Sequence, residues 1–221
     1  MKSSVLQRVG SLISKELLLD FKEKHVIYAI FLYMLTNVFV AYKTFIDIRP
    51  MIWNSLYVLI FLFVALNSIL KSFSNRFNSR HLFYYSLYNP TELLISKVLY
   101  NFFFLVIISI LMVFTLSFFS DVFPKDLRLM AVTILLGAFG FSVCFSFVAL
   151  LSVKSGNSST VFSILAIPLV VPILLLQVKI NAVSLGLIID STISKDLWLL
   201  VGVDLLFMAV AIILFPLLWR E

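Results

Sequence analysis

The stretch from Val98 to Phe119, "VLYNFFFLVIISILMVFTLSFF", contains no charged side chain. At 1.5 Å per residue, a helix of about 20 residues crosses the roughly 30 Å hydrocarbon core of a bilayer. Similar apolar runs recur along the chain, which has 221 residues and is 62% hydrophobic and only 13% charged. A soluble domain of this length has too much surface to hide so many apolar side chains. The sequence therefore predicts an all-α polytopic membrane protein.

Six runs are long enough to be transmembrane helices, and their continuity disfavours a barrel, whose strands alternate in hydrophobicity over shorter segments. An even number of spans places both termini on the same side of the membrane. The predicted spans cover approximately residues 26–45, 51–70, 97–119, 129–152, 160–178 and 197–218.

Lysine and arginine are distributed unevenly about these spans. Of the 17 basic residues, 11 lie on the side of the N-terminus and 6 on the other side. The positive-inside rule therefore predicts that both termini and the connections 71–96 and 153–159 are cytoplasmic. The net charge of +6 is explained by contact with anionic lipid headgroups rather than with nucleic acid, because the basic residues flank apolar runs. The larger group comprises Lys2, Arg8, Lys15, Lys22, Lys24, Lys71, Arg76, Arg80, Lys97, Lys154 and Arg220.

The first 25 residues are predicted to form an amphipathic helix at the membrane surface, ahead of a six-span domain over 26–221. Leu6, Val9, Ile13 and Leu17 recur at helical spacing, with basic residues largely off that stripe. The alternative is a soluble helix that packs on another subunit.

Polar residues inside the spans are candidates for function or for helix packing. Asp204 is the only carboxylate well inside a span, and an intramembrane acid is costly enough to suggest a functional role. The alternative is that it reaches the interface or pairs with a polar neighbour. Four asparagines are instead expected to form hydrogen bonds between helices: Asn37, Asn54, Asn67 and Asn101.

The fifth span contains Pro168 and Pro172, four residues apart and so on one helix face. Each removes a backbone donor and bends the helix. We expect either a mobile, gating helix or a static kink that improves packing. In the fourth span, Gly137 and Gly140 belong to a strip of small residues that predicts close helix approach.

The stretch 78–99, "NSRHLFYYSLYNPTELLISKVL", is too polar to span a membrane and too aromatic for a plain linker. Pro90 predicts a break after Asn89, and Thr91 could cap the helix that follows. No phosphate-binding loop or catalytic motif occurs in the chain, no catalytic or metal-binding residue is predicted, and the protein is not expected to be an enzyme. If it drives transport, the energy comes from a partner.

The segment "SLYNPTELLISKVLYN" (86–101) resembles the stretch after the second span of ABC exporter permeases. Pro90, Leu94 and Lys97 occupy matching positions. The resemblance implies a short cytoplasmic coupling helix that docks on a separate ATPase. The candidate docking residues are Arg80, Leu82, Tyr84, Tyr85, Leu87 and Pro90.

The segment "LLGAFGFSVCFSFVALLSVKSGNSSTVFSILAIPLVVPILLL" (135–176) resembles the fourth and fifth spans of the haem exporter protein B family. The matching residues are Ser163, Ile164, Leu165, Pro168, Leu169 and Pro172. The resemblance implies a permease subunit in the bacterial inner membrane that serves cytochrome c maturation. It implies three partners: a cytoplasmic ATPase that binds ATP, a second membrane subunit that handles haem, and a haem chaperone.

The sequence departs from this family pattern in two places. The stretch after the second span has no acidic residue before Glu92, whereas the family's stretch is usually richer in acids. Trp53, Trp198 and Trp219 stand singly at span ends, where interface anchors are expected, so direct haem binding by this chain is not predicted. The alternatives are a permease for a lipid, glycan or peptide, and a membrane scaffold that transports nothing.

Overall fold

The computed structural model describes residues 5–22, 24–45, 47–77, 89–153 and 158–219. These residues form helices and connections without a β-strand. Six of the seven helices are long and apolar enough to cross a membrane, which confirms the all-α class and the six spans. The helices are α1 (Val5–Lys22), α2 (Lys24–Thr44), α3 (Pro50–Phe77), α5 (Pro90–Ser120), α6 (Leu127–Val153), α7 (Ser158–Ser184) and α8 (Ile193–Trp219).

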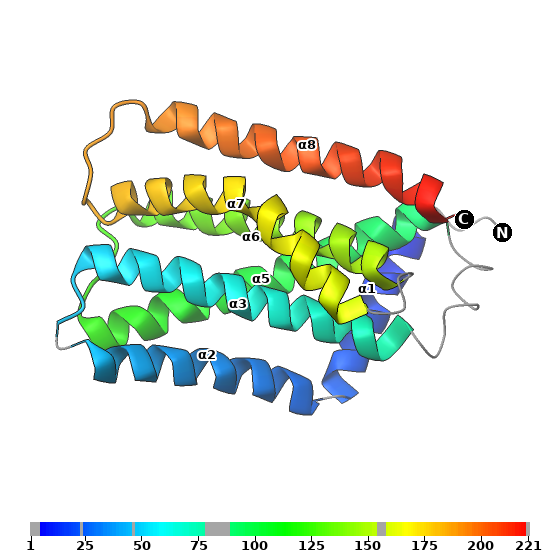
Figure 1. Ribbon diagram of the computed structural model, residues 1–221, viewed down its shortest axis with the longest axis horizontal. Helices are drawn as coiled ribbons and strands as arrows, with labels where there is room; N and C mark the ends of the chain where they lie inside the picture. The colour runs from blue at the N-terminus through cyan, green and yellow to red at the C-terminus, as the bar shows by residue number, and fades with distance from the viewer. Residues whose placement is uncertain (1–4, 23, 46, 78–88, 154–157, 220–221) are drawn as a thin grey trace.

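The six long helices lie roughly side by side and alternate in direction, while α1 is steeply inclined to them at one end of the bundle (Figure 1). We call this the α1 end; it also carries the last turns of α3, α6 and α8 and the first turns of α5 and α7. The opposite end carries the connections 45–49, 121–126 and 185–192. An amphipathic helix that lies across the ends of spans has the orientation expected at a membrane surface.

Helix α6 lies at the centre of the bundle and contacts α3, α5, α7 and α8. An aromatic series runs through the core: Trp53, Tyr57 and Phe61 stack along α3, and Phe61 meets Phe141 of α6. Phe141 contacts Phe145, which in turn contacts Phe162 of α7. Lipid tails are as apolar as these side chains, so close packing rather than water exclusion holds the helices together.

Two of the predicted interface anchors can be compared with the structure. Trp198 is 75% exposed near the start of α8, as an anchor would be. Trp53 is fully buried and stacked on Tyr57, so its predicted place at the lipid interface is wrong. The indole ring instead belongs to the aromatic series of the core.

The helices extend beyond the predicted spans, because hydropathy marks the hydrocarbon layer and not the helix ends. Helix α5 begins at Pro90 rather than near residue 97, and α7 continues to Ser184 rather than ending near 178. At about 46 Å, the 31-residue helix α5 is longer than the hydrocarbon core. Its first turns therefore reach past the core to the level of α1.

Specific residues fix the end of α7 and the start of α6. Gly186, with φ of 73°, follows α7; its N–H bonds the Val183 carbonyl, and the N–H of Leu187 bonds the Ala182 carbonyl. This pair of bonds is a Schellman motif, which favours glycine. The Asp126 carboxylate accepts hydrogen bonds from the Arg128 and Leu129 backbone N–H groups and so caps the start of α6.

Candidate functional site

The Asp204 side chain is almost fully buried between α6, α7 and α8, with 1% of the residue exposed. Neither carboxylate oxygen has a hydrogen-bond partner among the described residues. Asp204 lies eleven residues after Ile193, where α8 begins, so it is about 16 Å from that end of the helix. It therefore does not reach the interface or pair with a polar side chain, which were the alternatives to a functional role.

Two glycines of α6 leave the space that Asp204 and Gln177 occupy. A Cβ atom on Gly140 would collide with Asp204 Oδ1 and would lie 2.9 Å from Ile173 Cδ1. A Cβ atom on Gly137 would lie 2.5 Å from Gln177 Nε2. The small-residue strip therefore allows the close helix approach expected of it, and it also admits two polar side chains to the helix interface.

Gln177 is a site residue that the sequence analysis missed. It is fully buried, and neither its amide nitrogen nor its amide oxygen has a hydrogen-bond partner in the described part of the chain. Asn181, one turn further along α7, is also fully buried with both side-chain polar atoms unpaired. The available signal was a pair of amides four residues apart, on one helix face, at the end of an apolar run.

The same face of α7 continues to the opposite end of the bundle. Ser184 lies three residues beyond Asn181, and its hydroxyl donates to the Asn181 carbonyl and to Met130 Sδ of α6. We call Gln177, Asn181 and Ser184 the α7 polar face. It runs along α6 from Met130 to Gly137, one turn short of Gly140 and Asp204.

Two of the four asparagines bond between helices as predicted. Asn54 of α3 donates to the Val178 carbonyl of α7 at 2.8 Å, and Asn101 of α5 donates to Ser146 Oγ of α6 at 2.7 Å. Asn37 and Asn67 instead donate to carbonyls of their own helices. The prediction is wrong for these two, because each acceptor belongs to the preceding turn of the same helix; Asn37 is partly exposed and Asn67 is exposed.

Two further hydroxyl contacts cross helix interfaces. Ser142 of α6 donates to the Val98 carbonyl of α5, and Tyr57 of α3 shares a hydrogen bond with Ser109 of α5. Together with the asparagine bonds, they connect α3, α5, α6 and α7 through polar groups in an otherwise apolar core.

Ion pairs connect α1 to the first turns of α5. Glu16 accepts from Lys97 Nζ at 2.9 Å, and both side chains are about 95% buried, with 6% and 5% exposed. Arg8 pairs with Glu92 at 2.8 Å, and Glu92 is also buried. We call these two pairs the α1–α5 clamp. The apolar stripe of this helix was expected to face the membrane surface or another subunit; in the structure, the buried face of α1 includes Glu16, for which Lys97 provides a partner.

Five of the predicted docking residues, Arg80, Leu82, Tyr84, Tyr85 and Leu87, lie outside the described residues. Pro90, the sixth, is the first residue of α5 and is partly buried. Asn89 before it is extended, with φ of −69° and ψ of 140°, as a residue preceding proline should be. The N-cap is Asn89, two residues before Thr91, so the prediction that Thr91 caps the helix is wrong; Thr91 lies in the first turn.

Pro168 and Pro172 lie inside α7, which continues as a helix through both. Figure 1 shows α7 bending near its middle, where these prolines lie. Pro168 is exposed and Pro172 is partly buried. The proline side of α7 is therefore at least partly open to the outside of this chain, and neither proline is among the residues that contact Asp204.

At the opposite end, Lys179 lies between two carboxylates. It pairs with Asp196 of α8 at 2.6 Å and with Asp190 of the connecting loop at 3.2 Å. Hydrogen bonds from the Thr192 hydroxyl and backbone, followed by Lys179, lower the pKa of Asp190 to about 2. A carboxyl whose pKa is lowered in the folded loop stabilises that loop at pH values above its usual pKa, near 4. This stabilisation is lost as the pH falls toward 2. The connection between α7 and α8 is therefore held at neutral and mildly acidic pH.

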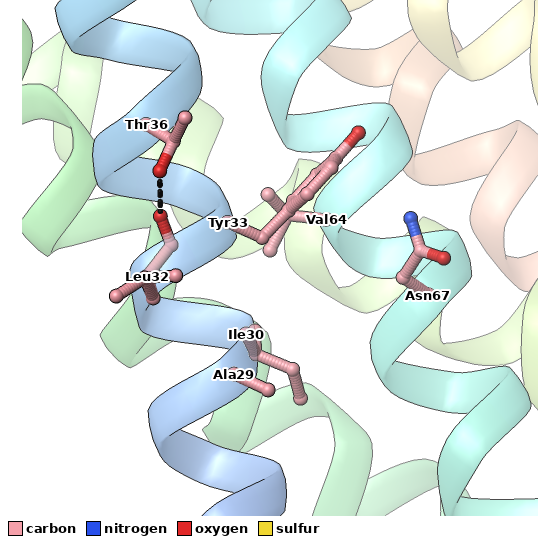
Figure 2. Close-up of a pocket in the computed structure, with 7 residues that line it drawn as sticks. All are labelled: Ala29, Ile30, Leu32, Tyr33, Thr36, Val64 and Asn67. Atoms are coloured by element: carbon pink, nitrogen blue, oxygen red, sulfur yellow. Dashed lines mark hydrogen bonds between the residues drawn. The ribbon is translucent and has the colours of Figure 1, made fainter.

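A pocket of about 350 Å³ lies between α2 and α3, in the half of the bundle toward the α1 end (Figure 2). Five of its seven lining residues are exposed, so in a bilayer it opens toward lipid tails. None of the predicted site residues lines it. The lining residues are Ala29, Ile30, Leu32, Tyr33, Thr36, Val64 and Asn67.

The described residues contain no group of three or more His, Cys, Asp or Glu side chains that could hold a metal ion. Comparison with known proteins does not extend this description. No family model, curated protein or solved structure matches the chain. What is established is a polytopic helical membrane protein with six candidate spans.

Proposed function

We propose that this chain is the membrane subunit of an ABC-type complex in the bacterial inner membrane, with both termini in the cytoplasm. ATP binds and is hydrolysed on a separate cytoplasmic subunit, so the chain itself is not an enzyme. By its resemblance to the haem exporter protein B family, the complex serves haem handling in cytochrome c maturation. Its other members are then a second membrane subunit and a haem chaperone.

The α1–α5 clamp is the observation that best supports a coupling role. The proposed docking segment 78–89 lies between α3 and α5 in the chain, and the clamp fixes the first turns of α5 to α1 directly after that segment. A buried pair at 2.9 Å resists separation, because parting it would take a close countercharge away from each of two buried ions. A push on the segment would therefore move α1 and α5 together instead of unwinding the start of α5.

Polar contacts provide a route from α5 into the rest of the bundle. Asn101 and Val98 of α5 bond to Ser146 and Ser142 of α6, and Ser109 of α5 bonds to Tyr57 of α3. The bend in α7 lies beyond these contacts and would accommodate the change in shape. ATP can drive such a change if the ATPase binds it more tightly in one conformation than in the other.

The experiment is co-purification with the proposed ATPase subunit. Replacing Tyr84, Tyr85 and Leu87 by Asp puts three carboxylates into the docking segment, and we expect loss of ATPase binding and of coupled ATP hydrolysis. Phe123→Asp is the matched control, because Phe123 is 64% exposed in a connection at the opposite end; this variant should retain both.

Binding and coupling that survive the triple substitution would refute the docking assignment. Mass spectrometry and an absorption spectrum of the wild-type complex test the haem assignment. An ATPase without a haem-handling partner would favour a permease for a lipid, glycan or peptide. ATP hydrolysis that is unchanged when this chain is deleted would favour a scaffold.

A further inference from the structure

Among the described residues, the Asp204 carboxyl has no countercharge. The structure pairs the described acidic residues Glu16, Glu92, Asp190 and Asp196 with basic side chains, but it gives Asp204 neither a cation nor a hydrogen bond. An ionised carboxylate in a membrane interior without either is costly by several kcal/mol at least. The state that removes this cost with the groups present is the neutral acid.

The unpaired amides beside Asp204 form the second observation. Gln177 and Asn181 carry four polar side-chain atoms that are buried and have no partner in the described part of the chain. Buried amides in proteins are nearly always satisfied by protein groups or by ordered water. Six unpaired polar atoms along one interface therefore fit a short file of water molecules better than a dry contact.

The position of these amides gives the file a direction. Gln177 approaches Gly137, and Asp204 approaches Gly140. Residues three apart on a helix have Cβ positions about 5–6 Å apart, so Gln177 and Asp204 contact neighbouring points on α6. Asn181 and Ser184 then lead along α6 to the opposite end, where the backbone N–H groups of Lys125 and Asp126 bond the Ser184 carbonyl. The corresponding face toward the α1 end is closed by apolar residues such as Ile173 and Val170, both fully buried.

We propose that Asp204 is a proton-binding site, reached from the end opposite α1 along the α7 polar face. In the step concerned, a hydronium ion at that end loses a proton to the first water of the file and becomes water. Each water of the file accepts one proton and passes another on, and the last water gives its proton to one Asp204 carboxylate oxygen. The net change is one O–H bond broken in hydronium and one formed on the carboxyl, whose charge changes from −1 to neutral. Gln177 and Asn181 are positioning residues, which hold the water molecules through their amide oxygens and N–H groups.

The other titratable groups on α8 and on the helices around it either form ion pairs away from Asp204 or lie several turns from it along their helices. Cys144 is the exception among the described residues. Glu92 and Lys97 of α5 belong to the α1–α5 clamp, and Lys179 of α7 pairs at the opposite end with Asp196. Cys144, one turn beyond Gly140 on α6, is buried and close enough to Asp204 to interact with it electrostatically. The remaining such groups are Tyr100 of α5, Arg128 at the start of α6 and Lys195 at the start of α8.

The test is infrared spectroscopy of the purified full-length protein in lipid nanodiscs. A protonated carboxyl has a C=O stretching band that ionised carboxylates lack and that shifts in D₂O. We expect this band at pH 7 in the wild-type protein and its loss on raising the pH. It should be absent from Asp204→Asn and unchanged in Asp47→Asn, whose carboxylate is 78% exposed.

A separate measurement tests the path. Replacing Gln177 and Asn181 together by Leu should leave the band in place but slow its shift after transfer to D₂O, which a merely structural role for the amides would not do. An exchange rate equal to that of the wild type would refute the path from the opposite end.

Two results would overturn the site itself. The first is a spectrum at pH 7 that is the same for wild type and Asp204→Asn. The second is loss of the band when sodium chloride replaces choline chloride at constant pH, which would make Asp204 a sodium site. If Asp204→Asn does not fold, Asp204→Glu decides: it should keep a carboxyl band at a shifted position, and an unmoved band would contradict the proposal.

Discussion

Individual residues decide which side chains enter the core of this bundle. Gly140 lacks the Cβ atom that would collide with Asp204 and Ile173, and Gly137 lacks the Cβ atom that would collide with Gln177. Sequence reasoning found Asp204, because a carboxylate in an apolar run is rare, and it found the glycine strip. It could not connect the two, since residues 64 positions apart in the chain meet only when α6 and α8 pack together.

Gly140→Ala tests this arrangement at the scale of one methyl group. The added Cβ forces Asp204 or Ile173 to move, and overpacking of this kind lowers the free energy of unfolding by about 1–3 kcal/mol. The measurement is the thermal unfolding midpoint in mild detergent, determined by fluorescence-detected size-exclusion chromatography.

The matched control is Gly202→Ala on α8, where nothing lies within 4 Å of the added Cβ. Because alanine favours a helix over glycine by up to about 1 kcal/mol, this variant should be as stable as the wild type or slightly more so. Equal midpoints for the two variants would show that Gly140 is not a close contact.

At the scale of elements, the joining of α1 to α5 is the feature that the sequence alone least suggested. The amphipathic stripe of α1 predicted a helix at the membrane surface or on another subunit. In the structure, α1 packs on α5 of the same chain. The stripe identifies an apolar face but not the surface that covers it. Glu16 and Lys97 lie 81 positions apart in the chain, so their charges gave no local signal of pairing.

Lys97→Met tests the α1–α5 clamp. The change removes the cation that lies 2.9 Å from the buried Glu16 carboxylate, and breaking a buried ion pair from one side costs about 3–5 kcal/mol. The double variant Glu16→Met, Lys97→Met should recover most of this loss, because two apolar side chains replace the pair. The thermal midpoints of the single and double variants measure the coupling.

Arg49→Met provides the comparison for an ion pair on the surface. Arg49 lies 3.7 Å from Asp47, and both side chains are about four-fifths exposed, so its removal should leave the midpoint unchanged. A double variant no more stable than Lys97→Met would show that the pair contributes no coupling between α1 and α5.

For the whole molecule, the ends of the bundle should face opposite sides of the membrane. The α1 end carries most of the basic residues, which predicts a cytoplasmic location. Ser11 of α1 and Ser191 in the connection between α7 and α8 are both exposed, so cysteines placed there should react with labelling reagents.

In a Cys144→Ala background, a membrane-impermeant maleimide added to intact cells should label Ser191→Cys and leave Ser11→Cys unlabelled. Permeabilised cells should label both, which controls for reactivity. The reverse pattern in intact cells would place α1 on the external side and remove the basis for a cytoplasmic docking segment.

By itself, the sequence determined the class of protein, the number of spans and the asymmetry of charge between the two ends. These properties depend on local composition and on the fixed thickness of a bilayer, so a single chain without contacts is enough to predict them. The tertiary structure decided which polar side chains find partners. Asn54, Asn101, Glu16 and Lys97 find them, whereas Asp204, Gln177 and Asn181 lie along one buried interface without a hydrogen-bond partner in the described part of the chain. Whether a polar group in a membrane is satisfied depends on which helix packs against it, and that is settled only when the helices assemble.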